Sequence, residues 1–339
     1  MDALKKAGLE TIPIGINQDI PDDINTFQIY GSRPFSMEKV FEWMKQEKRK
    51  IVYDVDDALA LTDKTNPWYY AVKKDMGAVE ESLRYADILT VSTPLMEEYM
   101  RTLTKKPIIV VPNCYTPSEW AFPRPTMPHK TPNALRIGFA GSATHVADLV
   151  HILPTIKKLQ DKYDITFIIM GFSKQSDYQK WYKEFLYFSP IEAIKELKKL
   201  NELLTTIKFE FVPYVNFEDY PATLTNMALD IGICPLIDTP FNRCKSACKA
   251  MEYTLSGALA LASDIPPYNR EDTSLLVNDW ETSLTALVEH PEHIEPIRLK
   301  KLAWLQENRN IDNQTELLKS IYEIQLWFMW RTSGMCQIW

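Results

Sequence analysis

Short runs of consecutive apolar residues, separated by stretches with helical periodicity, recur along most of the chain. Runs that are apolar throughout, without alternating polar residues, are typical of strands buried on both faces of a parallel sheet. These runs lie at 11–16, 26–30, 50–55, 87–92, 107–112, 135–141, 165–171, 207–213, 230–236 and 258–263. The helix-patterned stretches lie at 36–48, 78–86, 94–103, 147–163, 217–229 and 247–256. Their alternation predicts an α/β protein with doubly wound sheets.

The length of 339 residues and one break in the pattern indicate two domains. The segment 113–134 is rich in proline and has no clean periodicity, which is typical of a linker. A new strand then begins at 135. A long insertion, 172–206, separates two later strands and is predicted to form two helices, the first rich in aromatic residues.

Charge and cysteine content limit the class of partner. A net charge of −7 argues against a nucleic acid partner. The five cysteines show no CxxC spacing, so free thiols in a reducing cytoplasm are expected. The sequence shows neither a signal peptide nor the roughly 18–20 apolar residues of a membrane span. We expect a cytoplasmic protein; peripheral membrane contact through 181–188 or 322–330 stays open, and the oligomeric state is not indicated.

The stretch 235–271 carries the most specific chemical signal. It predicts a strand end, a polar loop and a helix that begins near Ser246, on which Ser246, Lys249 and Glu252 share one face. Gly257 is placed to end this helix. The free N–H groups and positive dipole end of a helix that follows a strand suit a diphosphate. A capped, charged helix start without a ligand is the alternative.

Cationic and carboxylate side chains stand at suitable places for such a ligand. Arg243 and Lys245 would add positive charge at the start of the helix. Glu252, two turns further on, could accept hydrogen bonds from both hydroxyls of a ribose.

The same stretch resembles the donor-site motif of the large family 4 type of retaining glycosyltransferases (glycosyl transferases group 1), which includes sucrose and glycogen synthases. Three further segments, 110–120, 136–156 and 211–236, resemble other parts of that family in the same order. The residues that match the donor motif are Ser246, Lys249, Glu252, Tyr253, Gly257, Ser263, Asp264 and Pro266.

The resemblance implies the GT-B fold: two Rossmann-like α/β domains that face each other across a cleft, the first of them shortened here. It implies an acceptor-side domain over 1–117, a linker over 118–134, a donor-nucleotide domain over 135–310, and a helix and tail over 311–339 that cross back. The implied activity is transfer of a sugar, of hexosyltransferase type and with retention, from a nucleoside diphosphate sugar to a hydroxyl of a glycan, glycolipid or other acceptor. No metal and no cofactor besides the nucleotide sugar is implied.

The resemblance also implies roles for particular residues. Glu252 would hold the ribose, and the backbone of Lys245, Ser246 and Ala247 would hold the diphosphate. The further donor contacts would be Gly141 and Ser142 at the phosphates, and Pro213 and Tyr214 at the base. The candidate catalytic residues are Lys249, Arg243 and His145, although a plain polar role is open for the histidine.

Two departures from the family pattern affect the expected chemistry. Many members carry a second glutamate eight residues before the ribose-binding one, and here that position is Cys244. An arginine often follows the first glycine of the phosphate loop, where this chain has Ser142, and His145 is the nearest basic group. Phosphate charge would then be neutralised by Arg243, Lys245 and Lys249.

On the acceptor side, Asp54, Asp56 and Asp57 stand at the end of a predicted strand. Helix capping by Asp56 or Asp57 is the first interpretation, acceptor binding the second and a divalent cation the third. Arg33 ends another predicted strand and could meet an acceptor phosphate or form a surface ion pair.

Other functions of the same fold class are less well supported. A dinucleotide dehydrogenase would need GxGxxG after a first strand, and no such string is present. A nucleotide-sugar epimerase of the same fold and a non-catalytic nucleotide-sugar-binding protein remain the alternatives.

Overall fold

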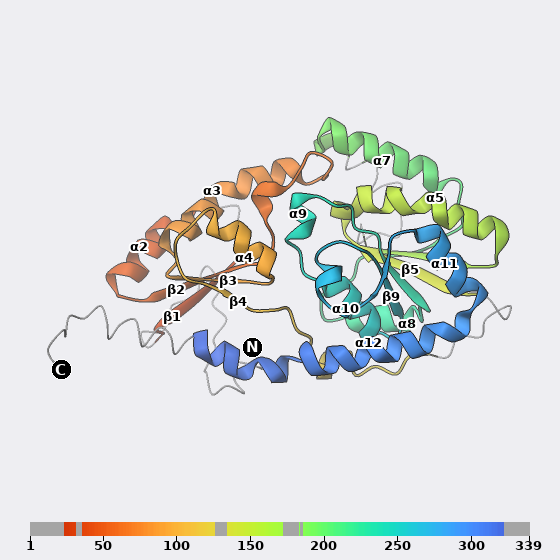
Figure 1. Cartoon of the computed structure of the whole chain (residues 1–339). Coiled ribbons are helices and arrows are strands. Elements are labelled where there is room, and N and C mark those ends of the chain that lie inside the picture. The colour runs from red at the N-terminus through yellow and green to blue at the C-terminus, as the bar shows by residue number, and fades with distance from the viewer. Residues whose placement is uncertain (1–23, 32–35, 126–133, 172–182, 184–185, 322–339) are drawn as a thin grey trace.

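The computed structural model describes residues 24–31, 36–125, 134–171, 183 and 186–321. These residues form two parallel sheets, each with its own helices, joined by a linker and by a C-terminal segment that returns to the first domain (Figure 1). The predicted strand 11–16 and the tail 322–330 lie outside the described residues. Among the described residues, no helix is both long and apolar enough to span a membrane.

The first sheet is built from four described strands in sequential order, β1-β2-β3-β4. They are β1 (Thr26–Tyr30), β2 (Lys50–Val55), β3 (Ile88–Val91) and β4 (Ile108–Val110), connected by α2 (Glu38–Gln46), α3 (Tyr69–Tyr85) and α4 (Pro94–Arg101). When each right-handed crossover leads to the next strand on the same side, all connecting helices lie on one face of the sheet. Figure 1 shows α2, α3 and α4 on the same side of the strands. The prediction of a doubly wound sheet is therefore wrong for the described part of this domain.

The second sheet has the order β10-β9-β8-β5-β6-β7 and is doubly wound, as predicted. Its strands are β5 (Arg136–Gly141), β6 (Thr166–Gly171), β7 (Glu210–Val212), β8 (Ile231–Cys234), β9 (Leu259–Ser263) and β10 (Leu275–Val277). The order reverses between β5 and β8, and in such sheets ligands bind beyond the carboxyl ends of the strands at this switch point.

Helices cover both faces of the second sheet. The larger core lies on the face of α5 (Val146–Lys162), α7 (Ile191–Leu204) and α11 (Trp280–Glu289). The opposite core is closed by α8 (Tyr220–Asn226) and α10 (Cys248–Leu255), and α12 (Ile294–Asn308) packs against α10. The short helix α9 (Pro240–Arg243) precedes α10. Short 3-10 segments lie at η1 (Leu59–Leu61), η2 (Pro117–Trp120), η3 (Ala143–His145), η4 (Tyr268–Arg270), η5 (Pro291–His293) and η6 (Ile311–Gln314).

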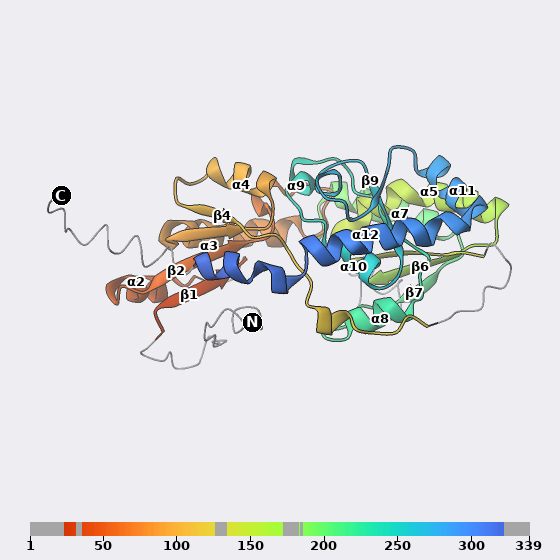
Figure 2. The same cartoon turned by 60° about the horizontal axis from the view of Figure 1, so that its bottom comes forward.

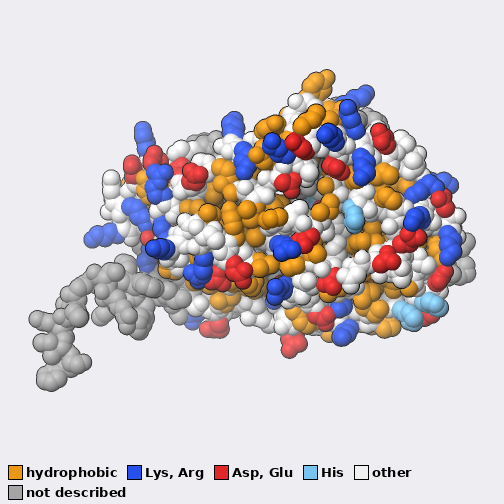
Figure 3. Space-filling model, turned by 45° about the horizontal axis from the view of Figure 1, so that its top comes forward, with side chains coloured by type: hydrophobic (Ala, Val, Ile, Leu, Met, Phe, Trp, Pro, Cys, Tyr) orange, Lys and Arg blue, Asp and Glu red, His pale blue; other side chains and the backbone are white. Residues whose placement is uncertain are grey.

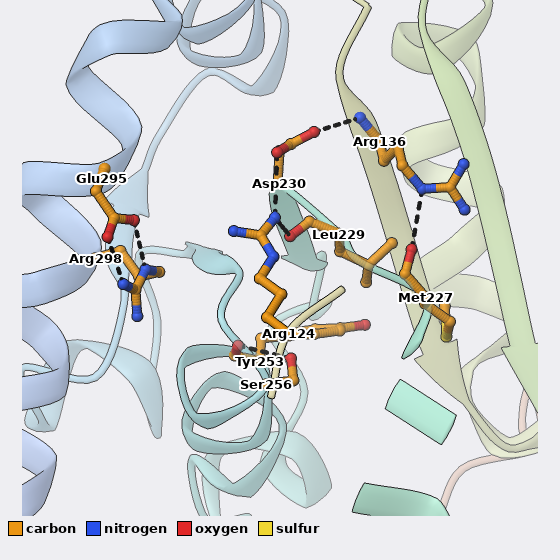
Figure 4. A network of polar contacts seen from close by, with 9 residues as sticks. All are labelled: Arg124, Arg136, Met227, Leu229, Asp230, Tyr253, Ser256, Glu295 and Arg298. Carbon is orange, nitrogen blue, oxygen red and sulfur yellow. Dashed lines mark hydrogen bonds and ion pairs between the residues drawn. The ribbon is translucent and has the colours of Figure 1, made fainter. Parts of the chain in front are cut away.

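The linker is fixed to the second domain at the amino ends of β5 and β8, opposite the carboxyl ends of these strands (Figure 4). Arg124 donates to the Leu229 carbonyl at 2.5 Å and pairs with the Asp230 carboxylate at 3.2 Å. The same carboxylate accepts from the Arg136 backbone N–H at 2.9 Å, at the start of β5. These contacts fix where the chain enters the second sheet.

The chain returns towards the first domain after α12. Tyr115 and Asn310 form an isolated parallel bridge beside the linker, and residues 315–321 are helical. Figures 1 and 2 show this last segment running from α12 along the first domain, as the predicted fold requires. Of the two helices predicted for 172–206, the second is α7, and the first falls mostly outside the described residues.

Candidate functional site

The switch point is held open by two side chains of α10. Strands β5 and β8 pair at Ile137↔Ile231 and Gly138↔Gly232. Beyond this point the Ala140 N–H donates to the Tyr253 hydroxyl at 2.5 Å, and Lys249 Nζ donates to the Ala140 carbonyl at 2.6 Å. Side chains four residues apart on one helix face thus bond the end of β5, and a small pocket lined by Phe139, His145, Cys234 and Lys249 lies between the ends of β5 and β8; we call it the crevice.

Of the two lysines predicted to hold phosphate, Lys249 lines this crevice, and Lys245 lies near enough to Lys249 and Asp148 to interact with both electrostatically. Burial lowers the pKa of Lys245; Asp57 and Asp148 oppose this shift, and Lys249 adds to it. Within the described ranges Lys245 has no carboxylate in ion-pair contact, and its Nζ lies 4.9 Å from the Phe241 ring centroid. A partly buried cation of this kind favours an anionic ligand.

The start of α10 differs from the predicted one. The helix begins at Cys248, its N-cap is Ala247, and no side chain caps its free N–H groups. The proposal that Ser246 shares a helical face with Lys249 and Glu252 is therefore wrong, because Ser246 precedes the helix. Its hydroxyl instead accepts from Asn113 Nδ2 at 2.9 Å, which ties the end of the first domain to the loop before α10.

His145 and Asp148 form a hydrogen-bonded pair beside the lysines. His145 Nδ1 lies 2.7 Å from Asp148 Oδ2, and Asp148 Oδ1 accepts from the Ile237 N–H at 2.8 Å. Burial, together with Lys249 and Lys245, holds the pKa of His145 well below its usual value, so the ring is neutral. Burial raises the pKa of Asp148 to about 6. The Nδ1–H therefore donates to Asp148, and Nε2 is left as an acceptor.

Glu252 lies deeper on α10, beside α8. The Tyr220 hydroxyl donates to Glu252 Oε2 at 2.9 Å, and the Trp120 ring stands edge-on to the Tyr220 ring at 6.5 Å. Burial raises the pKa of Glu252, and Lys249 and the Tyr220 hydrogen bond oppose this shift. Neither Tyr220 nor Trp120 was identified from the sequence, since only the tertiary structure brings them to α10.

Two other predicted residues are engaged away from the crevice. Arg243 is exposed, and its guanidinium forms two hydrogen bonds to Asp238, at 2.5 Å and 2.6 Å. Cys244 is buried in the apolar core of the first domain, and its backbone carbonyl accepts from the Thr93 hydroxyl at 3.0 Å. The position at which the family pattern has a carboxylate therefore forms a contact between the domains.

The remaining predicted donor contacts follow the ends of β5 and β7. Gly141 ends β5, and an added Cβ there would lie 3.0 Å from the Phe139 ring and 3.3 Å from the His145 ring. Ser142 follows it, exposed, with its hydroxyl 2.7 Å from that of Thr144. Pro213 and Tyr214 follow β7, two strands from the switch point; the Tyr214 side chain is exposed.

The acidic residues predicted on the acceptor side lie at the carboxyl end of β2. Asp54 accepts a hydrogen bond from the Thr90 hydroxyl, and burial raises its pKa. Burial, with Asp54 and Asp57, raises the pKa of Asp56 to about 6. No side chain caps η1, so the interpretation of Asp56 or Asp57 as a helix cap is wrong. The described residues contain no group of three or more His, Cys, Asp or Glu placed to hold a metal; Arg33 lies outside them.

The two domains meet at this site. Helix α9 contacts η1, and Asp57 lies close enough to Lys245 to act on its pKa. Lys245 on the donor side and Asp57 on the acceptor side thus lie near one another across the junction of the domains.

Comparison with solved structures identifies the fold. No protein-family model and no curated protein matches the sequence. Anabaena HepE in complex with UDP and glucose matches with a TM-score of 0.56 at 12% identity, over 87% of this chain and 77% of that one. The E. coli trehalose-6-phosphate structure with UDP-2-fluoro glucose matches with a TM-score of 0.56 at 14% identity, over 89% and 73%. TarM gives 0.58 at 12%, over 88% and 54%. The chain therefore has the GT-B fold, as the sequence predicted.

Proposed function

We propose that this protein transfers a sugar from a nucleoside diphosphate sugar to an acceptor hydroxyl, with retention at the anomeric carbon. The observation that carries the proposal is the convergence of Lys245, Lys249 and the uncapped start of α10 on the switch-point crevice. Two cations and free helix N–H groups together suit a diphosphate. The contact of η1 in the first domain with α9, which precedes the loop before α10, supports an acceptor site beside it.

In this mechanism, the bond between the anomeric carbon and the diphosphate oxygen breaks as the acceptor oxygen bonds to the same carbon. The hydroxyl proton leaves on the released diphosphate. Negative charge grows on that diphosphate in the transition state, and Lys245, Lys249 and the N–H groups of α10 would stabilise it. The proposal therefore requires no metal ion.

The other residues would orient the donor. Glu252, held by Tyr220, would accept hydrogen bonds from the ribose hydroxyls. His145 would offer Nε2 to a hydroxyl of the donor sugar or of the acceptor, and Asp148 is a positioning residue that fixes its tautomer. Base contacts at Pro213 and Tyr214, phosphate contacts at Gly141 and Ser142, and hexosyl specificity belong to the same proposal.

The complexes of HepE with UDP and glucose and of the E. coli protein with UDP-2-fluoro glucose make UDP and UDP-glucose the first ligands to test. We expect UDP to bind the purified chain in isothermal titration calorimetry, and a panel of nucleotide sugars to reveal a donor that is hydrolysed or transferred. If no nucleoside diphosphate or nucleotide sugar binds, the proposal is wrong.

Lys245→Met tests the phosphate assignment. A charge-assisted hydrogen bond contributes roughly 1.5–3 kcal/mol, so the variant should bind UDP about tenfold or more weakly. Lys300→Met, an exposed lysine on α12, is the matched control and should bind UDP like the wild type. Equal affinity of both variants would remove Lys245 from the site.

A second candidate, a nucleotide-sugar-binding protein without turnover, is favoured by one observation. Cys244 stands where the family pattern has a sugar-facing carboxylate, and it is buried against the first domain. Tight donor binding without release of free sugar or of a glycosylated product, across a panel of acceptors, would support this function over transfer.

A further inference from the structure

The first domain contains a cavity of about 640 Å³ between α3 and α4. Its floor is formed by Tyr53 and Val55 of β2, and its walls by apolar side chains of the two helices, among them Met76, Val79 and Met100. The volume lies within the usual range of ligand pockets, roughly 300–1,000 Å³, and a mostly apolar lining with a few polar groups is typical of them.

The cavity is elongated along α3. The residues of α3 that line it extend from Met76 to Arg84, which corresponds to about 12 Å at the rise of an α-helix. At its outer end, Leu103 is 50% exposed. Figure 3 shows the face on which α3 and α4 lie, where hydrophobic side chains gather over the first domain. Arg84, Thr104 and Lys106 also line the cavity at the end near Leu103. The mostly apolar stretch between its two ends, which includes the flexible side chains of Met76 and Met100, suits a linear hydrocarbon better than a rigid or polar molecule.

The inner end of the cavity is polar and faces the proposed donor site. Asp56 and Asp57 line this end. Asp57 acts on the pKa of Lys245, and Asp56 on that of Cys248, both in the loop and helix start that form the diphosphate site. A molecule lying in the channel would therefore present its polar end between two carboxylates and the donor.

We infer that this cavity binds the aliphatic chain of an amphiphilic acceptor, whose hydroxyl is held at Asp56 and Asp57 beside the donor sugar. The carboxylates accept hydrogen bonds from a hydroxyl, and the apolar walls bind the chain that carries it. A free monosaccharide or a polar peptide would leave the walls of the channel without a partner. That this ligand is an acceptor rests on the proposed function; that the cavity binds an alkyl chain does not.

Binding of two commercial probes to the purified full chain tests the inference. Octyl β-D-glucopyranoside, used below its micelle concentration, and methyl β-D-glucopyranoside share a polar head and differ in chain length. Because each buried methylene adds to affinity, the octyl compound should bind at least about tenfold more tightly in calorimetry. Equal affinity of the two probes would overturn the inference.

A pair of leucine variants locates the binding. Leu103→Glu places a charge at the outer end of the cavity and should weaken octyl glucoside binding about tenfold or more. Leu299→Glu is the matched control, since Leu299 is 49% exposed on α12, and should leave binding unchanged. Loss of binding in both variants, or in neither, would show that the alkyl chain binds elsewhere and would overturn the inference.

UDP binding, measured on the same samples, separates this inference from the proposed function. If UDP binds and the two glucosides bind alike, the cavity assignment fails and the donor assignment stands. If the octyl compound binds in the manner expected and no nucleotide or nucleotide sugar does, the cavity assignment stands and the proposed transfer fails. The expected result is that Leu103→Glu binds UDP like the wild type.

Discussion

Tyr253→Phe tests whether α10 holds the switch point open through the hydroxyl of Tyr253. This side chain is fully buried, and its hydroxyl accepts from the N–H of Ala140, which is 2% exposed. Phenylalanine keeps the ring, which packs against Gly232, and removes only the acceptor. The N–H of Ala140 would then lie inside the protein without a partner.

The magnitude follows from the cost of a buried donor left unpaired, about 1–3 kcal/mol. The free energy of unfolding should fall by this amount in urea titrations followed by circular dichroism. Tyr85→Phe is the control, because the Tyr85 ring also stacks on a buried ring, that of Phe41, while its hydroxyl is exposed and 3.5 Å from Glu38. That variant should unfold like the wild type. If both variants unfold at the same urea concentration as the wild type, the Tyr253 hydroxyl does not stabilise the end of β5 through the Ala140 N–H.

Three further measurements test the same structure. An added Cβ at Gly232 would lie 2.1 Å from the packed ring of Tyr253, and one at Gly138 would lie 2.4 Å from the movable end of Leu229. Gly232→Ala should therefore cost about 3 kcal/mol of unfolding free energy and clearly more than Gly138→Ala; equal losses would contradict this. Burial raises the pKa of Asp148 to about 6, so its stabilising contribution is present below about pH 4 and lost as the pH rises through 6. Relative to wild type, Asp148→Asn should gain roughly 2–3 kcal/mol between those pH values, and a constant difference would refute the shift. Transfer activity should survive treatment with EDTA, and its loss would show that a metal is required.

Most strands were predictable because strands buried on both faces of a sheet are runs of consecutive apolar residues. The bounds of β1 and β2 agree with the predicted 26–30 and 50–55. Helix α3 was predicted to begin at 78 and begins at Tyr69, since the aromatic residues of its first turn carry no helix-start signal. Strand β10, with three residues, was too short to stand out. Strand order is a property of packing, which explains why the sequential order of the first sheet was not foreseen.

Around the candidate site, one local feature was predictable, the end of α10. Gly257 ends α10 with φ +93°, a conformation that glycine adopts without strain, as the sequence indicated. The contacts that join distant segments were not predictable. The bonds from Tyr253 to Ala140 and from Tyr220 to Glu252 join residues 113 and 32 positions apart. The residue types show which side chains can form hydrogen bonds, but the pairs that form depend on the tertiary structure.

Cys244 lies in the contact between the two domains of this chain. Its thiol lies 3.8 Å from the Leu95 carbonyl in an apolar cluster. Burial raises the pKa of this thiol, and the negative charge of Glu98 raises it further. A glutamate here would place a second carboxylate near Glu98 in apolar surroundings, which is costly without a cation to pair with it. The backbone at Cys244, before α10, is thus part of the contact between the domains, where the Thr93 hydroxyl donates to its carbonyl. A donor sugar at the crevice would instead meet the carboxylates of the opposite domain, among them Asp57. Sugar recognition in this chain would then depend on the same contact between the domains that places the acceptor beside the donor.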